Sequence, residues 1–112
     1  EDYVKSLKRF DGIEATHLIV ARQPESGRKV LYFSPVYTDR FDGWTRDESL
    51  PLMKYLTGVL GKPEHTCRFR WGEGSLAMWD NRAVVHYALD DYVGHRRLMH
   101  RVTVNGPWLE PC

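Results

Sequence analysis

The sequence has few of the features that mark special classes of protein. Its 112 residues include only two cysteines, Cys67 and Cys112, too few for a disulfide framework. No apolar run approaches the roughly 18 residues of a membrane-spanning helix. Lys and Arg number 16 against 15 Asp and Glu, which argues against a nucleic-acid or membrane surface built on bulk charge. We therefore expect a protein of the reducing cytoplasm, with neither a nucleic acid nor a membrane as its partner.

The local motifs of several common enzyme classes are also missing. The sequence contains no Gly-rich phosphate loop, no Cys-x-x-Cys pair and no defensible Ser/His/Asp arrangement. It does contain four Trp, six Tyr and four Phe, and 42% of its residues are hydrophobic. That composition is typical of an ordinary globular chain, so residues 1–112 are predicted to form a single domain.

The pattern of apolar residues in the first third of the chain changes at residue 18, from one typical of a helix to one typical of strands. Residues 1–17 carry a rough apolar stripe that favours a helix. The short apolar runs 18–21 and 30–33 follow, separated by turn residues at 24–27. This arrangement predicts a β-hairpin.

A second helix is predicted after a long irregular connection. Asp47 or Ser49 is suited to cap it, Pro51 falls in its first turn, and Gly61 with Pro63 ends it. Its predicted apolar face consists of Leu52, Met53, Leu56, Val59 and Leu60.

The rest of the chain alternates polar and apolar residues in a way that predicts strands. The expected strands are 66–71, 76–79, 84–88 and 97–104. Strands without long helices between them favour antiparallel β structure, either a sandwich or a jelly roll, so the predicted fold class is mainly β with flanking helices. Cys67, on the first of these strands, is expected to be a buried free thiol.

The most informative stretch is WDNRAVVHYALDDYVGHRRLMHRVT, residues 79–103. On a strand, Arg97 and Arg101 would share one face about 13 Å apart, since each residue advances the chain by about 3.3 Å. Two arginines on the wall of a pocket would bind carboxylate, sulfonate or phosphate groups. A neutral imidazole such as that of His86 can bind a metal.

Simpler interpretations of the same residues stay open. A single histidine on a strand more often has a structural role, and two strand arginines usually lie on a solvated surface. The Trp79-Asp80-Asn81 step also fits a turn closed by an aspartate hydrogen bond.

In combination, these motifs resemble the C-terminal half of the taurine/2,4-D dioxygenase family of non-haem iron, 2-oxoglutarate-dependent oxygenases. The similar segments are PESGRKVLYF, VYTDRF, KPEHTCRFRW and WDNRAVVHYALDDYVGHRRLMHRVTV, in family order over residues 18–104. The resemblance implies a double-stranded β-helix, or jelly roll, that is incomplete in this chain. It also implies Fe(II) as cofactor, 2-oxoglutarate and O2 as co-substrates, and a small anionic organic substrate.

The resemblance assigns roles to five residues. His86 matches the distal iron-ligand histidine, and this makes it the predicted catalytic and metal-binding residue. Arg97 matches the arginine that pairs with the far carboxylate of 2-oxoglutarate, and Arg101 the one that holds the anionic end of the substrate. Tyr37 falls at a substrate-contact position, and Trp79 would form a wall close to the metal. The family commonly forms dimers or tetramers, which is compatible with a homo-oligomer.

The chain departs from the family pattern in two places. The family's first two iron ligands form a His-x-Asp or His-x-Glu pair, and none of the five histidines here begins such a pair. About six of the eight barrel strands are present. Residues 7–17 also resemble the helix before the family's active-site lid, whereas residue 18 onward resembles the strand after it. We therefore expect a C-terminal part of a longer enzyme, with a lid segment missing between His17 and Leu18.

Two other functional classes remain as alternatives. The first is a catalytically inactive β-barrel domain that binds a small anion or a protein partner, which the missing His-x-Asp pair would favour. The second is a nucleic-acid-binding β module, against which the balanced charge argues. Its contact residues would be Arg68, Phe69, Arg70, Trp71, Arg96, Arg97 and Arg101.

Overall fold

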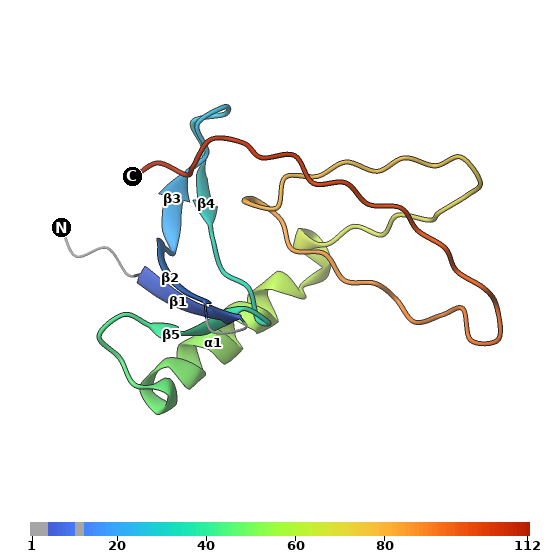
Figure 1. Cartoon of the computed structure of the whole chain (residues 1–112). Coiled ribbons are helices and arrows are strands. Elements are labelled where there is room, and N and C mark those ends of the chain that lie inside the picture. The colour runs from blue at the N-terminus through green and yellow to red at the C-terminus, as the bar shows by residue number, and fades with distance from the viewer. Residues whose placement is uncertain (1–4, 11–12) are drawn as a thin grey trace.

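A computed structural model describes residues 5–10 and 13–112, and it is mainly β with one α-helix (Figure 1). Three strands form one antiparallel sheet in the order β2-β1-β5: β1 (Lys5–Phe10), β2 (Ile13–Leu18) and β5 (Thr38–Phe41). The sheet and the helix lie at one end of the molecule, the end to which the C-terminal segment returns.

The helix predicted over residues 1–17 is wrong. The structure forms β1 and β2 there, and they pair along their full length from Lys5 with Leu18 to Phe10 with Ile13. Residues 1–4 and 11–12 of that prediction lie outside the described residues. The apolar stripe was weak, and pairing of β1 with both β2 and β5 overrides local helix propensity. The lid predicted between His17 and Leu18 stays a prediction.

The predicted hairpin is confirmed. Strands β3 (Val20–Arg22) and β4 (Lys29–Leu31) pair antiparallel as a separate two-stranded sheet. Gly27 closes the connecting turn at a φ of 67°, a backbone conformation that residues with a Cβ rarely adopt. On its other side, β3 meets the end of the chain, because Arg22 and Glu110 exchange both backbone hydrogen bonds, at 2.7 and 2.9 Å.

Helix α1 (Arg46–Leu60) covers the core. Its start was mispredicted, since the cap is Thr45, whose hydroxyl accepts the Glu48 N–H while the Glu48 carboxylate accepts the Thr45 N–H. Its end at Gly61 is as predicted, and a short 3₁₀ helix, η1 (Pro63–His65), follows. Among the residues whose burial the structure describes, the buried apolar ones are Ile19, Ala21, Phe33 and Phe41. Leu52, Met53, Leu56 and Leu60 of the helix pack against the core cluster of Ile19, Phe33 and Phe41. Among the described residues, no helix has the length and apolar character needed to cross a membrane.

A buried hydroxyl joins α1 to β5. Ser49 is fully buried, and its Oγ accepts the Phe41 N–H at 3.1 Å and donates to the Thr45 carbonyl at 2.8 Å. We expect Ser49→Ala to destabilise the fold by about 1–3 kcal/mol, because the Phe41 N–H would stay buried without an acceptor. Urea unfolding measures this change in the free energy of unfolding. The matched control is Thr57→Ala, which removes an exposed hydroxyl that also donates to the carbonyl four residues earlier. Equal stability of the two variants would contradict the prediction.

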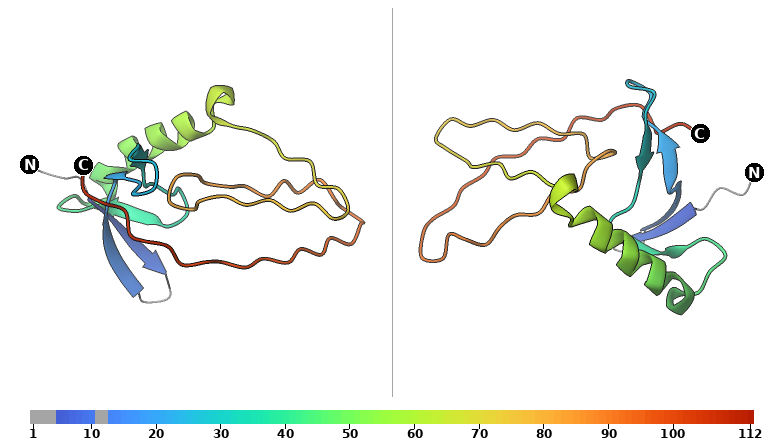
Figure 2. Two further views of the ribbon diagram at one scale, coloured as in Figure 1. Left: turned by 90° about the horizontal axis from the view of Figure 1, so that it is seen from above. Right: turned by 180° about the vertical axis from the view of Figure 1, so that it is seen from behind.

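The strands predicted after residue 65 do not form. Within residues 66–112, all of which the structure describes, pairing is limited to the single bridge at Glu110. Figures 1 and 2 show these residues as two long open excursions that reach away from the sheet and helix. A strand needs a hydrogen-bonded neighbour, and no described strand lies alongside them. Their apolar side chains are accordingly exposed, for example Met78 at 90% and Val102 at 91%.

Candidate functional site

The predicted ligand His86 lies two residues after a tight turn over residues 80–84, which Trp79 directly precedes. The two rings are in contact, with centroids 4.9 Å apart and planes tilted by 49°. The indole N–H of Trp79 donates to Asn81 Oδ1 at 2.9 Å, which holds the indole at the start of the turn. His86 is an exposed residue. The structure therefore brings together two of the five predicted site residues.

The turn itself is organised by Asp80. Its Oδ1 accepts the backbone N–H of Arg82 at 2.8 Å, which is the aspartate turn considered from the sequence. The Asp80 carbonyl accepts the N–H groups of both Ala83 and Val84 at 3.1 Å. Asp80 therefore directs the chain as it leaves the turn toward His86.

Sequence reasoning missed the ion pair between Asp80 and Arg82. The Arg82 guanidinium donates to both carboxylate oxygens, with Nε 2.9 Å from Oδ1 and an amino nitrogen 2.8 Å from Oδ2. Both side chains are largely covered, at 22% exposure for Arg82 and 29% for Asp80. Asp80 and Arg82 belong to the WDNR motif at residues 79–82, but the residues near this motif in the sequence do not show which distant residues Arg82 contacts.

Arg82 and Asp80 also bond to distant segments. Arg82 donates to Glu25 Oε2 at 2.9 Å and to the Pro107 carbonyl at 2.7 Å. Gln23 Nε2 donates to Asp80 Oδ2 at 2.5 Å. The β3–β4 hairpin, the turn and the returning C-terminal segment thus meet at one point, which we call the Asp80–Arg82 clamp.

The clamp is charged over the whole ordinary pH range. The Arg82 hydrogen bonds hold the pKa of Asp80 well below its usual value, against the opposing effect of burial. Hydrogen bonds to Asp80 and then Glu25 raise the pKa of Arg82 still further. The pKa of Glu25 is lowered as well, mainly by its hydrogen bond from Arg82.

The other three predicted site residues are not gathered around His86. Arg97 lies over the ring of Tyr92, with its Cζ 5.1 Å from the centroid. Arg101 is exposed on the same excursion, and Tyr37 is 48% exposed in the connection between β4 and β5. The placement of Arg97 and Arg101 on one face, predicted from strand alternation, depends on a strand that the structure does not form.

The donors present do not make up a complete metal centre. Among the residues that the structure describes, no group of three or more His, Cys, Asp or Glu side chains is placed to hold a metal ion. His86 fits one ligand of such a centre, as an exposed imidazole fixed beside an indole. The prediction that Cys67 is a buried thiol is wrong, because Cys67 is a free and exposed cysteine on an unpaired segment.

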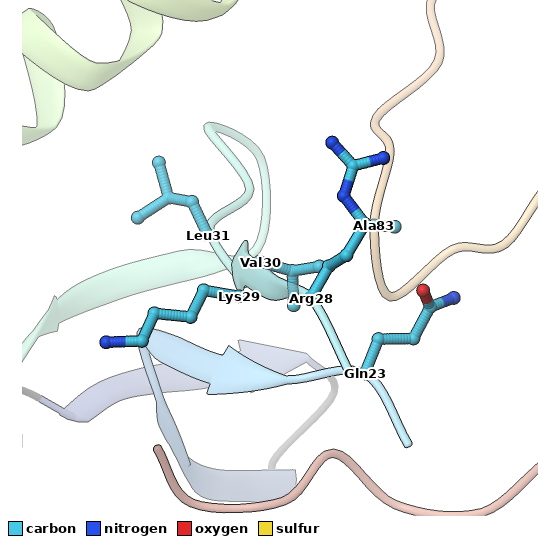
Figure 3. Close-up of a pocket in the computed structure, with 6 residues that line it drawn as sticks. All are labelled: Gln23, Arg28, Lys29, Val30, Leu31 and Ala83. Carbon is cyan, nitrogen blue, oxygen red and sulfur yellow. The ribbon is translucent and has the colours of Figure 1, made fainter. Parts of the chain in front are cut away.

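A cavity of about 340 Å³ lies between the hairpin and the turn. In Figure 3 the guanidinium of Arg28 and the amide of Gln23 extend on the side of Ala83, whereas Lys29 points away from it. The cavity is lined by Gln23, Arg28, Lys29, Val30, Leu31 and Ala83. None of the five predicted site residues is among them, so this cavity is separate from the predicted site.

Comparison with known proteins establishes the class. Residues 7–103 match the sequence model of the family described as "Taurine catabolism dioxygenase TauD, TfdA family". The chain belongs to the TauD/TfdA family of dioxygenases. This confirms the family inferred from the motifs of residues 18–104.

Three relatives define the likeness further. The chain is 36% identical over 93 residues to an alkylsulfatase of Acinetobacter baylyi, a match that covers 83% of this chain and 29% of that protein. It is 39% identical over 93 residues to an alpha-ketoglutarate-dependent sulfate ester dioxygenase of Pseudomonas putida, covering 83% of this chain and 31% of that protein. The crystal structure of a taurine dioxygenase from Burkholderia xenovorans matches with a TM-score of 0.67 and 39% identity, over 71% of this chain and 29% of that one. The chain therefore spans less than a third of the length of these relatives.

Proposed function

We propose that this chain is part of an Fe(II)- and 2-oxoglutarate-dependent dioxygenase that hydroxylates a small anionic substrate and releases succinate and CO2. The family match over residues 7–103 carries the proposal, because it includes His86, Arg97 and Arg101. The relatives named above include an alpha-ketoglutarate-dependent enzyme, alpha-ketoglutarate being another name for 2-oxoglutarate. In such a centre, Fe(II) held by two histidines and a carboxylate supplies open coordination positions.

In this proposal the chain's own residues bind and orient. His86 provides one metal ligand, and Trp79 keeps its imidazole in one orientation. Arg97 binds the far carboxylate of 2-oxoglutarate, since a guanidinium fork matches a carboxylate with two hydrogen bonds. Arg101 binds the anionic end of the substrate in the same way, and Tyr37 contacts the substrate.

The remaining two ligands and the missing barrel strands belong, in this proposal, to further parts of a longer protein. The short coverage of the relatives supports this, at 29% of one and 31% of another. The exposed apolar side chains of residues 66–104 support it too, because a jelly roll would bury them between its sheets. We place the complete enzyme in the cytoplasm, and a homo-oligomer is compatible with it.

The substrate class proposed is an organic anion. Alkyl sulfonates such as taurine, sulfate esters and phenoxy acids each offer Arg101 a group that accepts two hydrogen bonds. The names of two relatives, an alkylsulfatase and a sulfate ester dioxygenase, favour the sulfate esters among them.

A catalytically inactive domain that binds a small anion or a protein partner is the second candidate. The observation that favours it is the absence of a three-donor metal cluster among the described residues. The two candidates differ in one measurable property, the Fe(II)-dependent consumption of 2-oxoglutarate.

The deciding experiment uses the purified intact protein that carries this sequence. Its mass is measured first, and 13.1 kDa is the value for these residues alone. Fe(II) and 2-oxoglutarate are then combined in air, in separate reactions, with a short alkyl sulfate, an alkyl sulfonate and a phenoxy acid, and succinate is quantified. We expect a mass two to three times larger and succinate formation that stops when iron is chelated; the corresponding neutral alcohol serves as the control substrate. A protein of 13.1 kDa, or one that forms no succinate with any of the three substrate classes, would favour the inactive domain.

A further inference from the structure

The Asp80–Arg82 clamp joins three segments that are far apart in the sequence. Arg82 reaches Glu25 across 57 residues and Pro107 across 25 residues, and Gln23 reaches Asp80 across 57. These hydrogen bonds fix where the turn lies relative to the β3–β4 hairpin. Since the turn is short and closed by Asp80, its two ends move with the clamp.

Those two ends carry the Trp79–His86 ring pair. Trp79 directly precedes Asp80, and its indole is tied back to Asn81. On the other side, the Asp80 carbonyl fixes Ala83 and Val84, which leaves only Val85 before His86. His86 itself lies on an exposed excursion without strand pairing. Within the part of the chain that the structure describes, the ring contact that orients His86 is therefore the one with Trp79, which the turn holds in place.

The hydrogen bonds between Asp80 and Arg82 are of a kind that can hold the turn in one fixed position. Its two side chains are mostly covered, and the guanidinium donates to both carboxylate oxygens, an arrangement stronger and more directional than an exposed ion pair. Lysine would keep the charge but could not reproduce the planar fork that reaches Asp80, Glu25 and Pro107 together.

We propose that Asp80 and Arg82 are positioning residues: the clamp locks the turn against the β3–β4 hairpin and thereby sets the direction in which His86 presents its imidazole. The inference deepens the proposed function and rests on it only for the identity of the group that His86 binds. The orientation of the ring is a property of the protein without metal. It can therefore be tested whether or not the protein binds iron.

The test is NMR of the histidine ring protons in the metal-free intact protein. Because the indole of Trp79 shields protons that lie over it, the His86 resonances are expected to be displaced from those of an exposed histidine, and Trp79→Leu should assign that displacement. We expect Arg82→Lys to remove most of the displacement while the protein still unfolds cooperatively. The matched control is Arg46→Lys, which alters a 2.6 Å ion pair to Asp39 on an exposed arginine away from the turn. It should leave the His86 resonances unchanged.

A milder variant keeps the test decisive if Arg82→Lys fails to fold. Glu25→Ala removes one link between the hairpin and the clamp and leaves the hydrogen bonds within the turn intact. We expect it to move the His86 resonances in the same direction by a smaller amount. Unchanged His86 resonances in a folded Arg82→Lys protein would overturn the proposal, and where Arg82→Lys does not fold, unchanged His86 resonances in Glu25→Ala would overturn it.

Anaerobic Fe(II) binding separates the two hypotheses. If the wild-type protein binds Fe(II), the folded clamp variant, Arg82→Lys or else Glu25→Ala, is expected to bind it about 10- to 100-fold more weakly, the usual effect of losing a group that orients a ligand. Unweakened binding would contradict the positioning role. If the wild-type protein binds no Fe(II), the proposed function fails, and the NMR comparison still decides whether the clamp orients His86.

Discussion

Replacing His86 with alanine is expected to abolish iron-dependent turnover of 2-oxoglutarate in the intact enzyme. Loss of a group that only orients a metal ligand lowers affinity about 10- to 100-fold, so loss of the ligand itself should reduce turnover by at least about 100-fold. His86 is exposed and packs only against Trp79 among the contacts that the structure describes. Its removal should therefore disturb metal binding much more than folding.

The matched control for this variant is His65→Ala. His65 is also exposed, and its ring bonds to the Val59 carbonyl at 2.9 Å, near the end of α1. We expect His65→Ala to keep wild-type turnover. Succinate formation at saturating 2-oxoglutarate, together with Fe(II) binding, measures both variants. Wild-type turnover by His86→Ala would refute its assignment as a metal ligand.

Removal of Arg97 should affect a different kinetic constant from removal of Arg101. A hydrogen bond to a charged group contributes about 1.5–3 kcal/mol, which corresponds to roughly a 10- to 100-fold change in affinity. Arg97→Ala is therefore expected to raise the KM for 2-oxoglutarate by that factor. Arg101→Ala should raise the KM for the organic anion and leave that for 2-oxoglutarate nearly unchanged.

Arg96 provides the control for both arginine variants. It directly precedes Arg97 and would point to the opposite face if this segment forms a strand in the complete enzyme. Arg96→Ala should change neither KM. Steady-state kinetics with each co-substrate varied in turn measures all three variants. If Arg97→Ala and Arg101→Ala raised the same KM, the separate roles assigned to them would be wrong.

The sequence predicted best the features that depend on neighbouring residues. The turn at Gly27, the end of α1 at Gly61 and the aspartate turn at Asp80 are each formed by residues within a few positions of one another. These local interactions form regardless of the contacts that the rest of the chain makes. The family, too, followed from local motifs, because short segments in a fixed order identify it without any knowledge of their contacts.

Features that depend on distant partners were mispredicted or missed. The N-terminal residues form β1 and β2 in place of a helix because β1 pairs on both sides. The alternation of polar and apolar residues over 97–104 fits a strand. Such alternation indicates which face of a strand would be buried, but it does not show whether a partner strand is present to form the hydrogen bonds. The role of Arg82 was missed because Glu25 lies 57 residues away.

The same separation governs the order in which this part of the molecule folds. The β3–β4 hairpin closes over a few residues, whereas joining Glu25 to Arg82 closes a loop of 57 residues, with an entropic cost near 3.6 kcal/mol plus a constant. Hairpins form in about 1–10 μs, and contacts across long loops form more slowly. We therefore expect the hairpin, which carries Gln23 and Glu25 in its turn, to form before the turn at Asp80 docks against it. On a chain synthesised from its N-terminus, Gln23 and Glu25 are made before Arg82, so we expect the segment that carries His86 to acquire its orientation late in folding.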